Sequence, residues 1–433
     1  MTHRYDRRLT AAAIARVEGE GALHVQVVED EVREVRLDIY EPPRFFEAFL
    51  RGRSFTEPPD ITARVCGICP VAYQTSAYQA IEALCGVQPG EGIAALRRLL
   101  YCGEWIASHA LHVYMLHAPD FLGYPGAVEM AADHRDAVER GLSLRRAGNA
   151  IMELLGGRAV HPVNVRVGGF YSVPGPAALA GLRAQLESAL EPALETVSWV
   201  SAFDFPDLTV EHELLALTEP GRYPIERGTV MTSGGLAFDA AEFEQHVIEE
   251  QVPHSTALHA RLADRQGTYL TGPLARYTLN SRWLPPLAAA AAHAAGLRDS
   301  CRNPFRSIIV RAVEIVCALE EAIAIIGAYE QPPAASVPVR ARAGTGHGVS
   351  EAPRGVLYQR YDLDGDGIVL AARIVPPTSQ NQAAIERDLA QFVQARLSLD
   401  DEALTRACEQ AIRNYDPCIS CATHFLRMHV DRA

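Results

Sequence analysis

The chain has 433 residues, of which 48% are hydrophobic and 21% charged, a balance typical of a globular protein. Its formal net charge of −13 disfavours nucleic-acid binding, because an acidic surface repels phosphate backbones. No run of about 18 apolar residues occurs, so no membrane span is predicted. The polar first ten residues lack a signal-peptide core, and nine cysteines are too few for a disulfide scaffold, so we expect a cytoplasmic protein.

The first predicted element is a β-hairpin at about residues 22–40, because apolar and polar residues alternate on both sides of the acidic turn Glu29-Asp30. Pro42-Pro43 then interrupts the chain, and a short helix is expected over residues 44–52. Helical patterns dominate after Pro70, which suits the first position of a helix. We expect these helices over residues 70–86, 91–117, 136–155, 176–202 and 239–263, with one or two long helices over 287–330.

A Pro/Gly/Ala-rich break is expected over residues 331–350, followed by a second hairpin at about residues 356–376 and by further helix over residues 381–413. The fold class predicted from this order is mainly α with small β-hairpins (α+β). We expect a single domain over residues 1–424, with its helical core at about residues 70–330.

Two cysteine pairs stand near opposite ends of the chain, Cys66 with Cys69 and Cys418 with Cys421. Spacing of i, i+3 places both sulfurs of a pair on one side of a turn, so each pair can chelate a metal. Four thiolates would form a soft site suited to zinc, iron–sulfur or nickel–iron. The alternative is that each pair is an independent buried or redox dithiol. The other five cysteines lie singly in predicted helices and are expected in the core.

The motifs around these cysteines, RVCGICP from Arg64 and DPCISCATH from Asp416, resemble those of the large catalytic subunit of nickel–iron hydrogenases. Further matches to that family are RVEGE at residues 16–20, GGRAVHP at 156–162, GPLAR at 272–276 and EAPRG at 351–355. The form CGICPVAY resembles the cytoplasmic bidirectional, NAD(P)-coupled sulfhydrogenase group. Tyr73 stands where the commoner pattern has histidine.

The resemblance implies a hydrogenase large-subunit-like helical core and a centre that cleaves dihydrogen heterolytically. Nickel would be bound by Cys66, Cys69, Cys418 and Cys421. Cys69 and Cys421 would also bridge to an iron that carries carbon monoxide and two cyanides. Soft thiolate ligands suit such a redox centre.

The resemblance also assigns catalytic roles beside the metals. The thiolate of Cys418 or the guanidinium of Arg354 would take the proton, and Glu18 would relay it outwards. Asp416 would be a carboxylate close to the metals, and Pro353 and Thr378 would line the diatomic ligands. The alternatives are a surface salt bridge for Arg354, a turn carboxylate for Glu18 and a cap or turn for Asp416.

A magnesium site is implied as well, with Glu47, His424 and the backbone carbonyl of Arg373 as ligands. His109 and His112 have a spacing that could bind a metal, but core histidines are the stronger interpretation. Ser108 stands where many relatives carry another aspartate near the metals.

The resemblance further implies that residues 425–433 are removed by a maturation protease after nickel-insertion proteins have acted, which would leave His424 as the C-terminus. The alternative is an ordinary frayed terminus. The chain shows no nucleotide-binding motif and no cysteine cluster for iron–sulfur centres. We therefore expect diaphorase subunits that bind flavin and NADP or NAD, together with an iron–sulfur small subunit.

Three other functions are weighed against this one. The first is a deazaflavin-reducing hydrogenase subunit. The second is a non-catalytic scaffold like the related complex I subunit, which lacks the four metal cysteines. The third is a structural zinc protein, which elemental analysis would distinguish by its zinc content.

Overall fold

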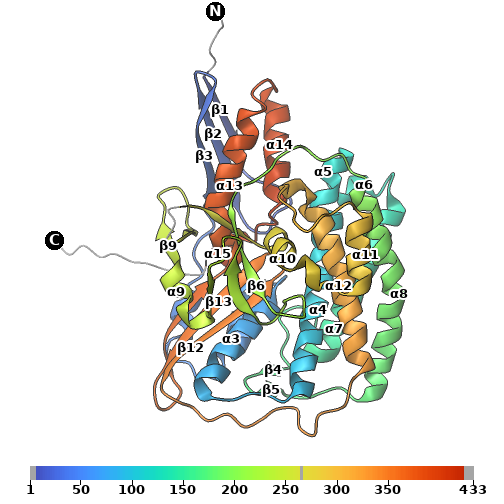
Figure 1. Cartoon of the computed structure of the whole chain (residues 1–433). Helices are drawn as coiled ribbons and strands as arrows, with labels where there is room; N and C mark the ends of the chain where they lie inside the picture. Colours follow the sequence, from blue (N-terminus) through green and yellow to red (C-terminus); the bar gives the residue numbers. More distant parts are fainter. Residues whose placement is uncertain (1–5, 264–266, 424–433) are drawn as a thin grey trace, which may run out of the picture.

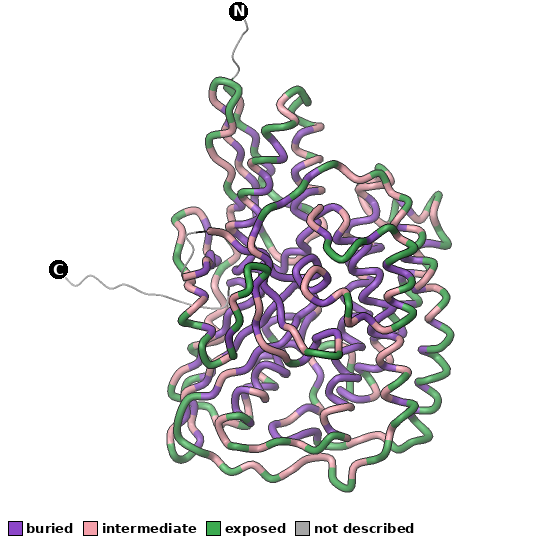
Figure 2. The backbone as a smooth tube through the Cα atoms, viewed as in Figure 1, coloured by how far each residue is buried: buried purple, intermediate pink, exposed green. Residues whose placement is uncertain are grey.

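The computed structural model describes residues 6–263 and 267–423 (Figure 1). Long helices lie together on one side of the molecule in this view, and small sheets with the remaining helices lie on the other. Purple, buried backbone in Figure 2 runs through both parts and between them. The mainly α architecture with small sheets confirms the predicted fold class.

The helical side is built from packed helices with different degrees of burial. The most central is α12, which is apolar on nearly all sides and buried over most of its length, as expected for an interior helix. It packs against both α4 and α8. The helices of this side are α4 (Glu91–Leu111), α5 (Ala118–Leu122), α6 (Ala127–Met130), α7 (Arg135–Gly156), α8 (Pro176–Ser201), α11 (Pro286–Ala294) and α12 (Ser307–Gly327).

Two of the predicted helical stretches are not single continuous α-helices. The helix expected over 91–117 is confirmed, but its last turn, His112–His117, widens to a π-type helix before α5 begins. The stretch 287–330 forms two helices, because Gly296 adopts a left-handed φ of 69° and Pro304 opens a new turn.

The first sheet is antiparallel, in the order β1 (Arg7–Ala11), β2 (Gly21–Val28) and β3 (Glu31–Ile39). The predicted hairpin is confirmed. Its turn residues Glu29 and Asp30 both have positive φ, 53° and 63°, the geometry of a tight two-residue turn. The added strand β1 was not predicted. One face of this sheet packs against α13 (Pro377–Gln394).

The predicted helix over 239–263 is wrong. This stretch holds a 3-10 turn (Ala240–Glu242) and the short helix α9 (Phe243–His246), followed by the hairpin of β9 (Val247–Gln251) and β10 (Leu258–Leu262). Pro253 lies between the two strands, and a proline there removes a backbone donor and disfavours a continuous helix. A further sheet has the order β11-β6-β7-β8, formed by β6 (Glu213–Thr218), β7 (Thr229–Thr232), β8 (Ala237–Phe238) and β11 (Tyr269–Thr271).

The second predicted hairpin is confirmed as β13 (Gly355–Leu363) and β14 (Val369–Val375), but a third strand, β12 (Gly344–Ala352), pairs with β13. The break expected over 331–350 is therefore wrong in its last part. The glycines that suggested a break serve a close approach to α3 (Pro70–Cys85) instead. A Cβ on Gly346 would lie 2.0 Å from the carbonyl oxygen of Ala80.

The remaining elements are short or lie close to the cysteines. They are β4 (Val165–Arg166), β5 (Gly169–Phe170), α1 (Phe46–Leu50), α2 (Pro58–Thr62), α10 (Pro273–Asn280), α14 (Asp401–Arg413) and α15 (Ile419–Ala422). Within the described residues, none of the helices combines the length and apolar character that crossing a membrane requires.

Candidate metal centre

The first cysteine pair sits at the start of α3. Cys66 follows a short 3-10 turn, and Cys69 directly precedes Pro70, whose ring suits the first position of the helix. The Sγ atom of Cys66 accepts backbone hydrogen bonds from Ile68 (3.2 Å) and Cys69 (3.4 Å). The backbone thus turns both sulfurs toward the same side.

The second pair sits at the end of the described chain. After α14, Asp416 turns the backbone with a left-handed φ of 51°, and Cys418 and Cys421 then flank and enter α15. The strand-like segment around Glu18 fixes this turn, since Ile419 donates its N–H to the carbonyl of Glu18 (2.8 Å).

The two pairs meet in one buried cluster. Cys66 and Cys418 have their sulfurs 3.4 Å apart, and the sulfurs of Cys69 and Cys421 are 3.7 Å apart. All four sulfurs lie within 4.8 Å of one another, and none of the four residues is more than 3% exposed. The alternative of two independent dithiols is therefore wrong.

The electrostatics favour a single thiolate in this cluster, at Cys66, because burial and hydrogen bonding within the cluster raise the pKa values of the other three thiols. Hydrogen bonding from Cys418, followed by that from Cys421 and Cys69, lowers the pKa of the Cys66 thiol well below its ordinary value. Burial raises the pKa of the Cys418 thiol. Burial opposes the charge of Arg354, but the charges of Asp416 and of the cysteines raise its pKa, so the guanidinium stays cationic.

Arg354 reaches the cluster from the two-residue turn between β12 and β13. Its Nε donates to the carbonyl of Asp416 (2.7 Å), and its Nη2 donates to the Asp416 carboxylate (3.2 Å). Because Arg354 is only 2% exposed, it does not form a surface salt bridge. Its Nη1 is buried and has no hydrogen-bond partner in the described part of the chain.

A buried ion-pair network holds that turn in place. Arg276, from α10, pairs bidentately with Glu314 of α12 at 2.8 Å and also contacts Glu351 at 3.0 Å. Arg276 additionally donates to the carbonyls of Ala352 (2.8 Å) and Pro353 (3.0 Å), directly before Arg354. The GPLAR and EAPRG motifs thus meet in space.

Glu18 contacts the cluster directly. The thiol of Cys418 lies 3.0 Å from Oε2 of Glu18, and the backbone N–H of Ser420 donates to the same oxygen (3.1 Å). The glutamate is therefore more than a turn carboxylate, since its side chain touches one of the four sulfurs.

Thr378 contacts the same segment from the start of α13. Its hydroxyl oxygen accepts the backbone N–H of Cys418 (3.0 Å), which leaves the hydroxyl hydrogen free to donate elsewhere. Pro353 lies in the β12–β13 turn beside Arg354, with its carbonyl bound by Arg276. Both residues thus lie on segments that contact the cysteine cluster.

The residues expected to bind magnesium are only partly described. Oε1 of Glu47, on α1, accepts the backbone N–H of Ile374 (2.8 Å), so this carboxylate meets the peptide that joins Arg373 to Ile374. His424 and the peptide 425–433 lie outside the described residues.

Three site residues were not predicted from the sequence. Glu104, inside α4, accepts the backbone N–H groups of Val71 (2.5 Å) and Ala72 (3.2 Å) and so caps α3 next to Cys69. Arg44 donates to the carbonyls of Val65 (2.7 Å) and Ser420, each next to a cysteine. In the sequence, Glu104 is marked only as a charged residue inside an apolar helix, and Arg44 only as an arginine after a Pro-Pro break.

The third is Arg311 of α12, which is 1% exposed and donates to the carbonyl of Asn414 (3.0 Å). It belongs to no recognisable motif, so the sequence alone does not single it out.

His109 and His112 are buried away from the cysteine cluster. His109 pairs with Glu314 and His112 contacts the carbonyl of Arg413, so the prediction of core histidines is supported.

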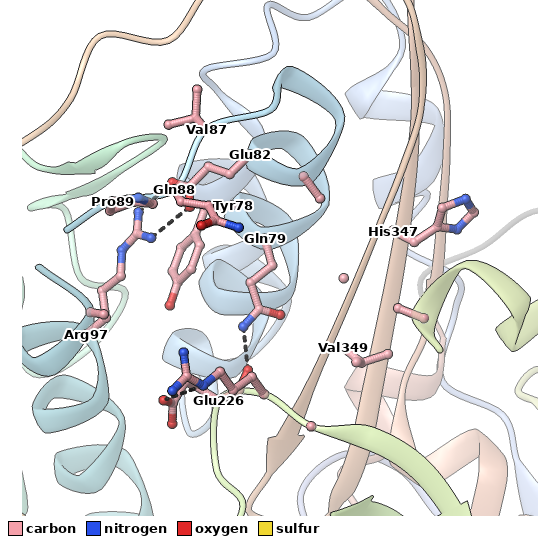
Figure 3. A pocket seen from close by; sticks show the side chains of 16 residues that line it. Tyr78, Gln79, Glu82, Val87, Gln88, Pro89, Arg97, Glu226, His347 and Val349 are labelled. Carbon is pink, nitrogen blue, oxygen red and sulfur yellow. Dashed lines mark hydrogen bonds and ion pairs between the residues drawn. The ribbon is translucent and has the colours of Figure 1, made fainter. Parts of the chain in front are cut away.

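A pocket of about 460 Å³ lies apart from this cluster, and none of the four cysteines lines it (Figure 3). Two of its polar side chains have protein partners: Arg97 pairs with Glu82 at 2.7 Å, and Gln79 donates to the backbone carbonyl of Glu226. These contacts give Arg97 and Gln79 a structural role.

The donor set of the cluster fits the metals that the sequence suggests. Four buried sulfurs converge, one of them favours the thiolate, and a cationic guanidinium lies nearby to balance negative charge. Soft sulfur ligands of this kind suit nickel, iron and zinc.

Comparisons with known proteins help to distinguish among nickel, iron and zinc. A family model described as nickel-dependent hydrogenase matches residues 44–143. The alpha chain of sulfhydrogenase 1 from Pyrococcus furiosus is 33% identical, with 97% of this chain and 98% of the relative covered. A chain of the F420-non-reducing hydrogenase from Methanothermobacter thermautotrophicus is 27% identical, with 96% and 94% covered.

Solved structures agree with these relatives. The crystal structure of an NAD+-reducing NiFe hydrogenase in the H2-reduced state has a TM-score of 0.86 at 27% identity, covering 98% of this chain and all of that one. A NiFeSe hydrogenase of Dm. baculatum, 20% identical with a TM-score of 0.79, shares the fold over 97% of this chain and all of its own. Because the sulfhydrogenase relative exceeds 30% identity over nearly the full length, the chain belongs to the nickel-dependent hydrogenase family as a catalytic large subunit.

Proposed function

We propose that the protein catalyses the reversible oxidation of dihydrogen to two protons and two electrons, which begins with heterolytic cleavage into a proton and a hydride. The centre would be a nickel bound by all four cysteines, with an Fe(CO)(CN)2 unit bridged by Cys69 and Cys421. The observation that carries this proposal is the meeting of four buried sulfurs from opposite ends of the chain. When bound, the nickel–iron unit would supply the site at which dihydrogen is polarised and its electrons are taken up.

The protein's own residues would move the proton. Cys418 Sγ and Glu18 Oε2 lie 3.0 Å apart, a distance over which a proton passes between a thiol and a carboxylate without a bridging water. We therefore assign Cys418 as the first proton acceptor and Glu18 as the relay. The Ser420 N–H holds the carboxylate of Glu18 in this position.

Arg354 and Asp416 would stabilise charge at the reacting position. Two nitrogens of the guanidinium are engaged by Asp416, which leaves Nη1 as a buried donor for a ligand or substrate. A fixed cationic donor in a water-poor site stabilises developing negative charge strongly. Asp416 would act by orienting Arg354.

Thr378 and Pro353 would surround the diatomic ligands of the iron, with the Thr378 hydroxyl donating to a cyanide. Glu47, His424 and the Arg373 carbonyl would bind magnesium, for which carboxylate and carbonyl oxygens are suitable ligands. The peptide 425–433 would be removed by a maturation protease after nickel insertion, which leaves His424 as the C-terminus.

The electrons would pass first to an iron–sulfur small subunit, then through diaphorase subunits to NADP or NAD in the cytoplasm. The support is the sulfhydrogenase name of the 33% identical relative and the NAD+-reducing activity of the hydrogenase whose crystal structure is similar. A single domain over residues 1–424 would serve as the catalytic part of that complex.

Infrared spectroscopy of the purified complex tests the centre, because bound carbon monoxide and cyanide absorb where protein does not. We expect these bands in the parent and in Cys85→Ser, a control at a cysteine outside the cluster. Cys418→Ser should lose hydrogen-dependent dye reduction. Full activity in Cys418→Ser would refute its ligand role, and zinc bound to the four cysteines without nickel would favour a structural zinc protein.

The acceptor is tested separately, by hydrogen-dependent reduction of NADP, NAD and deazaflavin with the same complex. Turnover with NADP or NAD supports the proposed route. Turnover with deazaflavin alone would replace it with the deazaflavin-reducing alternative and leave the metal centre unaffected.

A further inference from the structure

A second cluster of metal-binding side chains lies outside the cysteine centre. One nitrogen from each of His254 and His259 and a carboxylate oxygen of Glu386 all lie within 4.8 Å of one another. The histidines come from the β9–β10 hairpin, His254 from its turn and His259 from β10, and Glu386 comes from α13. The hairpin is at the left edge of Figure 1, and α13 packs against β10.

The contacts within this cluster leave one group unexplained. His254 Nε2 pairs with Glu386 Oε1 at 2.8 Å, and the backbone N–H of Leu37 donates to the same oxygen at 2.8 Å. The ring of His259 meets that of His254 edge to face, with 5.5 Å between ring centroids. His259 is 5% exposed, and its Nε2 is buried without a hydrogen-bond partner among residues 6–263 and 267–423. A buried nitrogen without a partner is unfavourable and calls for an explanation.

The residue types and the separation suit a zinc-like ion. Two imidazoles and one carboxylate are a ligand set that binds Zn²⁺ with a fourth position left to water. Ligands about 2.0–2.1 Å from the ion at tetrahedral angles lie roughly 3.4 Å from one another. To bind the ion, the 2.8 Å separation of His254 and Glu386 would increase slightly, and His259 would move closer to both. Side-chain rotation is sufficient for these movements.

The site is also accessible from solvent. The side chains of His254 and Glu386 are 19% and 16% exposed, so an ion can enter without unfolding the hairpin. Glu386 also lines a shallow pocket of about 280 Å³ between β3 and α13. Burial, together with the nearby His254, lowers the pKa of His259 to about 4, which keeps its ring in the neutral form that binds metals.

We propose that His254, His259 and Glu386 form a binding site for a zinc-class divalent ion that fastens the β9–β10 hairpin to α13. The ion would bind one ring nitrogen of the buried His259 and would join the hairpin to the helix whose second residue, Thr378, binds the backbone of Cys418. The site shares no residue with the cysteine centre, so it stands or falls independently of the hydrogenase reaction.

Zinc retention tests the proposal on the full chain in its purified complex. The protein is equilibrated with zinc chloride, dialysed against metal-free buffer and analysed for zinc. We compare the parent with His254→Gln, His259→Gln and Glu386→Gln, and with His293→Gln as a control at an exposed histidine on α11. Glu386→Gln keeps an acceptor for the Leu37 N–H, so it preserves the local fold even where a histidine variant does not.

The parent and His293→Gln should retain about one zinc per chain more than the three site variants, with an X-ray absorption shell at about 2.0–2.1 Å. At a hundredfold excess over Kd, zinc should raise Tm by roughly 2–4 °C in the parent and not in Glu386→Gln. Equal retention by the parent and Glu386→Gln would overturn the proposal. So would a sulfur shell at about 2.3 Å, which would place the ion on cysteines instead.

Discussion

Replacing Arg354 by lysine separates the charge of this residue from its geometry. The guanidinium uses Nε and Nη2 to hold Asp416, at 2.7 and 3.2 Å, while Nη1 stays available. Lysine keeps the positive charge but has one nitrogen. If this nitrogen pairs with Asp416, the position of Nη1 is left empty.

The size of the effect follows from the contact that is lost. A hydrogen bond from a charged donor contributes about 1.5–3 kcal/mol, and each 1.36 kcal/mol corresponds to about a tenfold change in rate. We therefore expect Arg354→Lys to reduce hydrogen-dependent activity about 10- to 100-fold. The nickel and iron contents should stay unchanged, because none of the four cysteines is altered.

The assay is hydrogen-dependent reduction of a viologen dye by the purified complex, with metals measured in the same preparation. Arg360→Lys is the matched control, since Arg360 lies on β13, the strand that follows the turn holding Arg354, but is 30% exposed and pairs with Glu244. It should keep full activity. Activity of Arg354→Lys within twofold of the parent, with normal metals, would refute the role assigned to the guanidinium.

Three further predictions follow from individual contacts. Glu18→Gln keeps an acceptor for Ser420 but carries no acidic proton, so turnover should fall at least tenfold (about 1.4 kcal/mol or more) with metals retained. Gly272→Ala should lower Tm, measured by calorimetry, because Gly272 has a φ of 114° and a Cβ there would lie 2.7 Å from the carbonyl oxygen of Arg354. Burial raises the pKa of Glu351 from 4.5 to about 7, so the native state binds a proton that the unfolded state releases over this range. The stabilisation that this proton provides is complete below pH 4.5 and is lost as pH rises to 7. In denaturant titrations, the free energy of unfolding of Glu351→Gln should lack about 3 kcal/mol of the fall that the parent shows over this range.

Local patterns predicted those elements whose causes are local. The start of α3 follows from Pro70, and the β2–β3 turn follows from the acidic pair Glu29-Asp30 between two stretches of alternating apolar and polar residues. The parallel pairing of β11 with β6 has no local signal, because the two strands are far apart in the sequence. The stretch 239–263 misled for a related reason, since its apolar spacing also fits a hairpin, of which strand β10 packs against α13.

The site shows the same division between motif and tertiary placement. The cysteines, Glu18 and Arg354 carry motifs, and the structure brings them together. Glu104 and Arg44 carry none. Their function depends on which backbone groups the fold places beside them, namely the start of α3 for Glu104 and two carbonyls for Arg44.

The two cysteine pairs are held in different ways, and this difference bears on how the centre assembles. Cys69 begins a 16-residue helix that Glu104 caps, so the first pair belongs to a rigid element. The second pair lies in a four-residue helix held mainly by contacts from Glu18 and Thr378 and by one bridge from Arg44. Because Arg44 contacts carbonyls next to both pairs, it sets their separation across the site. The first pair is thus attached to a long helix and the second to contacts from distant segments, so we expect bound metal to stabilise the placement of α15.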